Sequence, residues 1–285
     1  MCENTRVFTD VPLKDYTTFK IGGNAERLVV TDDAKTLARE YGGALLIGCG
    51  SNLLVGDGGV KGTVIRFCSQ RCEPEILSQS SDGAIVYISG AVKISRLSRF
   101  AATNGLSGLE WASKIPGTVG GAVKMNAGAH GGDVKSILVF ADVLKGEKTL
   151  RTDLKELKLG YRTSGFDGAV VGAAFALIKS SARKVCEETE RLCKLRSASQ
   201  PSGASAGSVY KAAGGVPAYK YIVESGLAGL RIGGAKVSEK HANFIINEGG
   251  ATARDVLELM NRIESEVYRR FGVVLVREVK TIGEF

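Results

Sequence analysis

Short runs of β-branched and aliphatic residues, separated by glycines, fill the first two-thirds of the chain. Such runs predict strands, here over residues 27–30, 44–47, 63–67, 84–89, 137–143 and 169–178. Helical patterns interrupt them over 33–41 and 93–104, and the second pattern aligns four apolar residues in one stripe, Ile94, Leu97, Phe100 and Ala101. We therefore predict a mixed region of helices and strands, of the α+β class.

The pattern changes near residue 182, where we expect a domain boundary. A charged helix is predicted from 182 to about 196, and a link rich in serine, glycine and alanine follows it over 197–208. The clearest helix begins after Thr252, which is spaced from Asp255 as in a capping box, and it ends at Gly272. Its apolar positions recur at helical spacing: Val256, Leu259, Met260, Ile263 and Val267. A final strand is predicted over 273–279.

The composition is that of a globular protein with unusually many glycines. The chain has 285 residues, of which 37 are glycine, 44% are hydrophobic and 24% are charged. These values exclude a disordered or collagen-like chain and indicate loops in which the backbone approaches a neighbour closely. The best uncharged stretch, residues 168–178, is shorter than the roughly 18 residues that a bilayer crossing needs. Since the first residues also do not form a secretory signal, we expect a cytoplasmic protein without a membrane partner.

Charge and cysteine usage narrow the possible partners. The formal net charge of +8 suits nucleic acids, anionic surfaces or small ligands that carry phosphates. No basic cluster and no RNA-binding aromatic motif occurs, so we do not expect a nucleic-acid partner. The six cysteines form no CxxC pair and are expected to be free thiols. With only His130 and His241 in the chain, we expect no metal site.

The first candidate for chemistry is a turn at residues 48–55, with the sequence GCGSNLLV, directly after a predicted strand. Successive backbone N–H groups in such a turn, with Ser51 and Asn52 beside them, suit a diphosphate. The turn is not a dinucleotide fingerprint, because Leu53 stands where the third glycine would be. No GxxxxGK[ST] motif occurs either. A plain hairpin turn is the alternative for this segment taken alone.

The second candidate is a loop at residues 108–129, with the sequence GLEWASKIPGTVGGAVKMNAGA. Five glycines and one proline among these 22 residues specify a tightly shaped loop that can bring its backbone against a flat or anionic ligand. A structural loop at a domain edge is the alternative, and Trp111 is expected to pack in the core. Two such loops with neutral linings in one chain favour a ligand site.

These segments, taken together, resemble one enzyme family, the UDP-N-acetylenolpyruvoylglucosamine reductases. The resemblance rests on GCGSNLLV, IPGTVGGAVKMNAGAHGGD, GYRTSGF, SAGSVYK, GGAKVSEKHANFIIN and REV, in order along essentially the whole chain. It implies an FAD enzyme in which NADPH reduces the flavin. The flavin then reduces the enolpyruvyl ether of UDP-N-acetylglucosamine enolpyruvate to the lactyl ether of UDP-N-acetylmuramate, a peptidoglycan precursor.

The resemblance also implies a domain plan. Residues 1–181 would form a two-lobed FAD-binding region of the vanillyl-alcohol oxidase type, with lobes of about 1–62 and 63–181. Residues 182–285 would form a smaller α+β domain for the UDP-sugar. The expected FAD-binding residues are Gly48, Gly50, Ser51, Asn52, Leu53, Leu54, Ile115, Pro116, Gly117, Val119, Gly120, Gly121, Asn126, Gly128 and Ala129.

The reaction itself defines the catalytic groups. Hydride addition to an enol ether conjugated to a carboxylate needs a cation, an acid that shares a proton with the enol, and a proton donor. Arg162 has the planar fork that suits a carboxylate, and Ser208 matches the family's proton-donor serine. Glu278 alternates with Val274 and Val276, and burial of that face would raise its pKa. The alternatives are a surface arginine, a serine of a flexible link and a glutamate that faces water.

Further expectations concern substrate binding. Lys211 and Lys240 suit the diphosphate of UDP, and Tyr161, Tyr210 and Asn243 suit the sugar or the base. His241 is expected to hold its own loop.

The chain departs from the family pattern at several positions: Ala212, Ala213, Tyr219, Cys49 and His130. None of these positions is catalytic, so we expect activity with altered affinity. The alternatives to the reductase are another flavin oxidoreductase on the same scaffold and a protein that binds flavin or UDP-sugar without turnover. A monomer is expected.

Overall fold

The structure is a computed structural model that describes residues 5–69 and 72–285. Its internal contacts divide the chain into two compact units. Unit 1 contains a segment ending at Val7, Val29–Cys49 and Val64–Arg196, and unit 2 contains Phe8–Leu28, Gly50–Thr63 and Ser197–Phe285. The boundary expected at 181/182 concerns which residues serve cofactor and substrate, and it stays a prediction.

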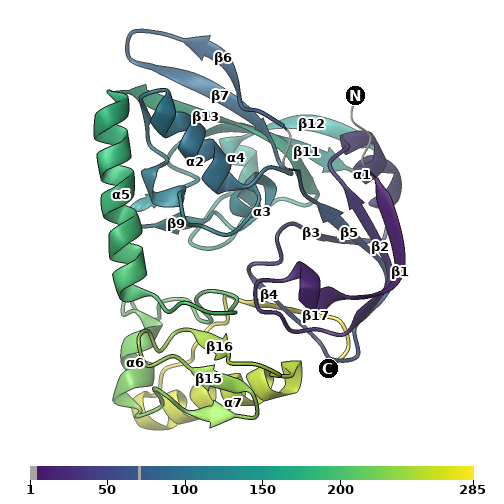
Figure 1. Ribbon diagram of the computed structural model, residues 1–285, viewed down its shortest axis with the longest axis vertical. Helices are drawn as coiled ribbons and strands as arrows, with labels where there is room; N and C mark the ends of the chain where they lie inside the picture. Colours follow the sequence, from purple (N-terminus) through teal and green to yellow (C-terminus); the bar gives the residue numbers. More distant parts are fainter. Residues whose placement is uncertain (1–4, 70–71) are drawn as a thin grey trace. The chain divides into compact units, whose positions relative to one another are not determined.

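Unit 1 is built on a sheet with the order β12-β11-β13-β7-β6, in which β8 also pairs with β13. The central strand β13 has seven successive buried residues from its start, as expected for a strand covered on both faces. Helices α2 and α3 pack on this sheet, and Leu97 and Val119 share a core with Val86 and Phe175 (Figure 1). The bounds are β6 (Glu75–Gln79), β7 (Gly83–Ser89), β8 (Leu106–Ser107), β11 (Leu138–Lys145), β12 (Lys148–Asp153), β13 (Ala169–Lys179), α2 (Ile94–Thr103) and α3 (Val119–Lys124).

A second sheet has the order β1-β2-β5-β3, and β3 pairs with β5 in parallel. Helix α1 begins after Asp33, whose carboxylate accepts a hydrogen bond from the amide of Thr36 (2.7 Å). The bounds are β1 (Arg6–Pro12), β2 (Asn24–Thr31), α1 (Ala34–Glu40), β3 (Leu45–Ile47) and β5 (Val60–Phe67). The shorter elements and the long charged helix are η1 (Leu13–Tyr16), η2 (Glu110–Ala112), β9 (Gly128–Ala129), β10 (Gly132–Asp133), α4 (Leu154–Leu157) and α5 (Ala182–Ser199).

Unit 2 packs helix α7 against the three-stranded sheet β14-β15-β16. The five apolar residues predicted for α7 are all fully buried, and the capping box of Thr252 and Asp255 and the stop at Gly272 are confirmed. The bounds are β4 (Leu53–Val55), α6 (Ala218–Glu224), β14 (Arg231–Ile232), β15 (Ala235–Val237), β16 (Ile245–Asn247), α7 (Ala253–Phe271) and β17 (Lys280–Ile282). Within the described ranges, no helix is long and apolar enough to cross a membrane.

The α+β class is confirmed. The elements expected from the sequence correspond, within a few residues, to the strands β2, β3, β5, β7, β11 and β13 and to the helices α1, α2, α5 and α7. The sequence does not predict the remaining elements, among them α3, α6 and the sheet β14-β15-β16. The strand expected over 273–279 is wrong, since the terminal strand is β17, which pairs in parallel with β4. Leu275 and Val279 are the buried residues of the segment, whereas Val274 and Val276 are 70% and 56% exposed. The condition set for Glu278, a face buried together with these two valines, is therefore not met, and Glu278 itself is half-buried.

Candidate functional site

The guanidinium of Arg162 is held in place by the glycine-rich loop of unit 1. Its Nη2 donates to the carbonyl of Gly128 (2.6 Å), and its Nη1 donates to the carbonyl of Asn126 (3.5 Å). Tyr161 is 58% exposed, and its ring lies 5.1 Å from the guanidinium carbon. The structure thus brings together two segments that the sequence singled out separately.

Asn126 organises the same loop from inside. Its side chain is buried and donates to the carbonyl of Gly160 (2.9 Å) and to the carboxylate of Asp133 (3.3 Å). The side-chain oxygen Oδ1 of Asn126 accepts a hydrogen bond from the backbone amide of Lys135 (2.9 Å). Because the side-chain amide is committed to protein partners, we assign Asn126 the positioning of the loop.

In the segment 115–121, the backbone amides of Val119, Gly120 and Gly121 donate hydrogen bonds to other groups of the protein. The amides of Val119 and Gly120 donate to the carbonyls of Val92 (2.7 Å) and Gly90 (2.9 Å). The amide of Gly121 donates to Oγ1 of Thr118 (3.2 Å), and a Cβ added at Gly121 would meet only that oxygen. Gly121 is exposed, so a ligand here could approach its backbone closely.

Thr118 joins this segment to the other glycine-rich loop. A Cβ added at Gly48 would lie 2.5 Å from Thr118 Oγ1, so only glycine permits this close approach. Gly48 and Thr118 are therefore packed against each other in unit 1. The two loops that the sequence assigned to one ligand meet at this contact.

Ser164 is a candidate ligand contact that the sequence analysis did not single out. Its Oγ is buried and has no hydrogen-bond partner among the described residues, although buried hydroxyls are usually paired. It lies two residues after Arg162, within the GYRTSGF segment. An unpaired hydroxyl near a fixed guanidinium suits a ligand that carries oxygen or nitrogen acceptors.

Ser208 and Glu278 belong to neighbouring segments of unit 2. Ser208 pairs with Phe244, and the amide of Val209 donates to the carbonyl of Asn243 (2.8 Å). On its other side, the carbonyl of Val209 accepts from the amide of Glu278 (2.7 Å). Ser208 and Glu278 are both half-buried, so each can be reached by a ligand.

Arg277 anchors the Glu278 segment to α7. Its guanidinium donates to both carboxylate oxygens of Glu264 (2.5 and 2.9 Å) and to the side chain of Asn261 (2.7 Å). The hydrogen bonds to Glu264 raise the pKa of Arg277. This two-point ion pair fixes the backbone next to Glu278.

The turn after Gly48 reaches the same part of unit 2. Gly50 has a φ of 61°, and a Cβ there would lie 2.4 Å from the carbonyl oxygen of Tyr16, so glycine is required. Asn52 donates from its side chain to the carbonyl of Glu278 (3.1 Å) and accepts from the amide of Lys280 (3.0 Å). A predicted cofactor residue and a predicted catalytic residue are therefore neighbours.

The side chains of Tyr210 and Asn243 form hydrogen bonds with protein groups near the Ser208 and Glu278 segments. Tyr210 is 2% exposed, and its hydroxyl donates to the carbonyl of Met260 (2.9 Å). The side chain of Asn243 bonds the amide (2.9 Å) and the carbonyl (2.8 Å) of Tyr210. Both side chains are committed to the protein, so our proposal does not use them as ligand contacts.

The two lysines expected to bind the diphosphate, and the residues that follow Lys211, can be placed in the structure. Lys211 is half-buried, whereas Lys240 donates to the carbonyl of Ser197 (2.6 Å). Ala213 pairs with Val216 around a two-residue turn in which Gly214 and Gly215 have positive φ, as a tight hairpin turn requires.

The aromatic and histidine expectations can also be placed. Trp111 packs in the core, as predicted, and its Nε1 donates to the carbonyl of Gly108 (2.9 Å). The ring of His241 lies 5.1 Å from that of Tyr219 and 5.0 Å from that of Phe244. Burial lowers the pKa of His241, and its buried Nδ1 has no hydrogen-bond partner within the described ranges.

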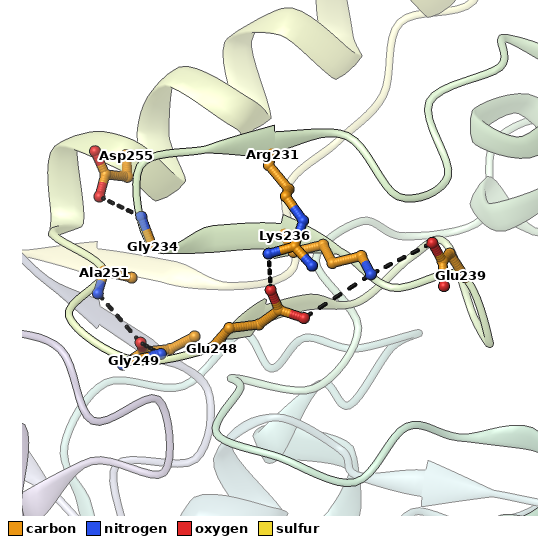
Figure 2. A network of polar contacts seen from close by, with 9 residues as sticks. Arg231, Gly234, Lys236, Glu239, Glu248, Gly249, Ala251 and Asp255 are labelled. Atoms are coloured by element: carbon orange, nitrogen blue, oxygen red, sulfur yellow. Dashed lines mark hydrogen bonds and ion pairs between the residues drawn. The ribbon is translucent and has the colours of Figure 1, made fainter.

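The sheet of unit 2 carries cations that are already neutralised. Arg231 and Lys236, on β14 and β15, both pair with Glu248, and Lys236 also pairs with Glu239 at 3.3 Å (Figure 2). At the edge of this network, Asp255 accepts from the amide of Gly234 (3.3 Å). These cations form ion pairs within unit 2, so we do not assign them to a ligand. In the part of the chain that the structure describes, no group of three potential metal ligands could hold an ion.

The sequence matches two family descriptions. Residues 33–152 match an FAD binding domain, and residues 199–282 match the C-terminal domain of UDP-N-acetylenolpyruvoylglucosamine reductase. Together they cover more than half of the chain, and they include both glycine-rich loops and the Ser208 and Glu278 segments.

Similar proteins cover nearly the whole chain. The reductase of Lachnoclostridium phytofermentans is 39% identical, over 98% of this chain and 94% of its own length. Reductase 2 of Symbiobacterium thermophilum is 42% identical, over 95% of this chain and 91% of its own length. The crystal structure of the Thermus caldophilus reductase superposes with a TM-score of 0.85 at 33% identity and covers 98% of this chain and 99% of that one. The chain therefore belongs to the UDP-N-acetylenolpyruvoylglucosamine reductase family.

Proposed function

We propose that this enzyme uses NADPH to reduce UDP-N-acetylglucosamine enolpyruvate to UDP-N-acetylmuramate, with FAD as the cofactor. Bound FAD would accept a hydride from NADPH and pass it to the enolpyruvyl group. The exposed backbone at Gly121, the loop at 48–54 and the unpaired hydroxyl of Ser164 fit such a cofactor. The division into an FAD region up to residue 181 and a UDP-sugar region after it belongs to the same proposal.

The observation that carries the proposal is the placement of Ser208 and Glu278. The amide of Glu278 bonds the carbonyl of Val209, the residue directly after Ser208, so a hydroxyl and a carboxyl come from adjacent segments. The reaction needs a proton for the α-carbon and an acid that shares a proton with the enol oxygen. We assign the first role to Ser208 and the second to Glu278.

Arg162 supplies the positive charge. Hydride addition places negative charge on the fragment that carries the carboxylate, and a fixed guanidinium stabilises this charge without reorganising. The carbonyls of Asn126 and Gly128 hold the group in one orientation, which is what preorganisation requires. Lys211 and Lys240 remain candidates for the diphosphate of the substrate, and Tyr161 for its sugar or base.

The anaerobic visible spectrum of the purified protein tests the whole proposal. We expect a flavin spectrum that NADPH bleaches and that UDP-N-acetylglucosamine enolpyruvate restores. A protein that bleaches but is not restored would keep the flavin scaffold and exclude this substrate. A protein that binds no flavin even after FAD is added would overturn the proposal.

A further inference from the structure

Cys49 and Cys68 leave two neighbouring parallel strands at the same level in unit 1. Strands β3 and β5 pair Leu45 with Val64 and Ile47 with Arg66. The same register, extended by two residues, would place Cys49 opposite Cys68. Parallel strands lie about 4.8 Å apart, within the range of Cα separations that a disulfide bridges. Both cysteines are free and half-buried, and the two thiols are close enough for each to shift the pKa of the other.

The surroundings give the two thiols different characters. The interaction with the neighbouring Cys49 thiol lowers the pKa of Cys68 to about 6; burial opposes this effect, and the charges of Arg66 and Lys93 support it. The same interaction and burial raise the pKa of Cys49. Near neutral pH, Cys68 is therefore the thiolate and Cys49 the protonated partner, which is how an attacking and a resolving cysteine divide their roles.

We propose that Cys49 and Cys68 form a redox site that reacts with hydroperoxides and closes to a reversible disulfide. The Cys68 thiolate attacks one peroxide oxygen, the O–O bond breaks, and hydroxide or alkoxide leaves, so that Cys68 becomes a sulfenic acid. The Cys49 sulfur then attacks the Cys68 sulfur, and the sulfenic oxygen leaves as water with the thiol proton. The two thiols lose two electrons in total, and the peroxide gains them. An external dithiol reverses the change by exchange.

The position of Cys49 couples this site to the proposed cofactor loop. Cys49 lies between Gly48, which packs on Thr118, and Gly50, which packs on the backbone of Tyr16. A bond from Cys49 to the end of β5 would restrain this turn. We expect the disulfide form to release FAD at a different rate, a consequence that rests on the proposed function.

Peptide mass spectrometry of the FAD-loaded protein tests the thiol chemistry. Trypsin separates the three neighbouring cysteines, since Cys49 lies in peptide 40–61, Cys68 in 67–71 and Cys72 in 72–93. After brief treatment with hydrogen peroxide, we expect peptides 40–61 and 67–71 to be joined, with the loss of two hydrogens, and dithiothreitol to separate them. A link between 67–71 and 72–93, or no link at all, would overturn the proposal.

The pH dependence of alkylation tests the division of roles. Alkylation of Cys68 by iodoacetamide should rise with a midpoint near pH 6. At pH 5.5 it should be about tenfold faster than expected for a thiol of ordinary pKa. The exposed Cys186 provides the comparison in the same digest. In Cys49→Ser, peroxide should leave Cys68 as a sulfenic acid that dimedone traps, whereas Cys186→Ser should still form the disulfide. A Cys68 midpoint of 8 or above would contradict the assigned roles.

Flavin fluorescence separates this inference from the proposed function. Release of FAD is compared between the reduced and the peroxide-treated protein, with Cys186→Ser as the control. An equal rate in both forms would exclude the coupling to the cofactor loop. Failure to bind FAD at all would overturn the proposed function and leave the peptide result as the test of the thiol pair.

Discussion

Arg162 and two residues of the glycine-rich segment 126–130 adopt backbone conformations that residues other than glycine usually avoid. Asn126, His130 and Arg162 have φ values of 41°, 51° and 53°. Each such residue costs on the order of 1 kcal/mol, which the surrounding contacts must offset. The buried hydrogen bonds of Asn126 and the two carbonyls that hold Arg162 provide this compensation. Strain of this kind concentrates where a side chain must point in one direction, which agrees with the role proposed for Arg162.

Replacing Ser208 with alanine should separate the two half-reactions. We expect flavin reduction by NADPH to stay nearly unchanged, because Ser208 is assigned only to protonation of the enolpyruvyl product. Reoxidation by the substrate should slow by about 10² to 10⁴, the usual contribution of a positioned proton donor. Stopped-flow absorbance of the flavin under anaerobic conditions measures both steps.

Equal slowing of both half-reactions by Ser208→Ala would contradict the proton-donor role. Ser205→Ala is the matched control, because it removes a hydroxyl from the same segment but not from the proposed site. Ser205 contributes its backbone carbonyl to Thr18 (2.7 Å), and alanine keeps that carbonyl. We expect this variant to behave as the unmodified protein in both steps.

The sequence alone names candidate catalytic residues but says little about what surrounds them. Arg162, Ser208 and Glu278 were singled out from motifs and from the chemistry that the reaction requires. The orphaned hydroxyl of Ser164 was missed, although its segment was quoted, because only a structure shows which buried hydroxyl lacks a partner. Tyr210 is expected from the sequence to contact a ligand, but an aromatic residue close to the proposed proton donor Ser208 can equally pack in the core, as Tyr210 does.

At the scale of elements, the segment 273–279 shows how Glu278 is positioned without a regular strand. Arg277 pairs with Glu264 of α7 on one side, and Glu278 bonds Val209 on the other. The alternating apolar residues predict a strand here, because this pattern indicates which side chains can be buried. It does not indicate which backbone groups find hydrogen-bond partners in a neighbouring strand. Leu275 and Val279 fill the core, and single hydrogen bonds replace a ladder.

Replacing Glu264 with glutamine should weaken this anchor. The loss of a charge-assisted, two-point interaction with Arg277 should reduce the free energy of unfolding by about 1 to 2 kcal/mol. Since the Glu278 backbone follows Arg277 directly, reoxidation by the enolpyruvyl substrate should also slow, with little change in reduction by NADPH. Urea titration and the stopped-flow assay measure the two effects. Glu258→Gln, an exposed position of the same helix, is the control, and an equal effect there would refute the anchoring role.

Replacing Asp255 with asparagine should destabilise α7 in a pH-dependent manner. Hydrogen bonds from the backbone amide of Thr252 and from other groups lower the pKa of Asp255 below its usual 3.8. A carboxyl whose pKa is lower in the folded protein than in the unfolded chain stabilises the fold when the pH is above its unfolded-state pKa. This stabilisation is lost as the pH falls through its folded-state pKa. We expect a deficit of about 1 kcal/mol at neutral pH that shrinks in acid below about pH 4. Denaturation at several pH values measures it, and a deficit independent of pH would contradict this account.

At the scale of the whole molecule, chain order and spatial grouping differ. Unit 2 contains Phe8–Leu28 and Gly50–Thr63 in addition to the C-terminal residues, so early segments share a core with α7. Phe19 and Leu54, for example, belong to the same buried cluster as Leu259. The change in residue pattern near 182 suggests a domain boundary there. It does not show that segments early in the chain pack in the same core as the C-terminal residues. This grouping also places Asn52 beside Glu278.

Hydrogen exchange with each ligand in turn tests how function is distributed over the chain. FAD should slow exchange in peptides that cover 48–54 and 115–129, because a ligand that binds only the folded state suppresses local opening where it makes contacts. The enolpyruvyl sugar nucleotide, added to the FAD-loaded protein, should slow exchange mainly between 182 and 285, around 208–211 and 240–243. Uridine alone is the control, since it lacks the diphosphate and the enolpyruvyl group. If FAD protected peptides after residue 182 as strongly as the two loops, the functional boundary at 181/182 would be wrong. The cofactor site would then have to be extended to the segment that carries Ser208.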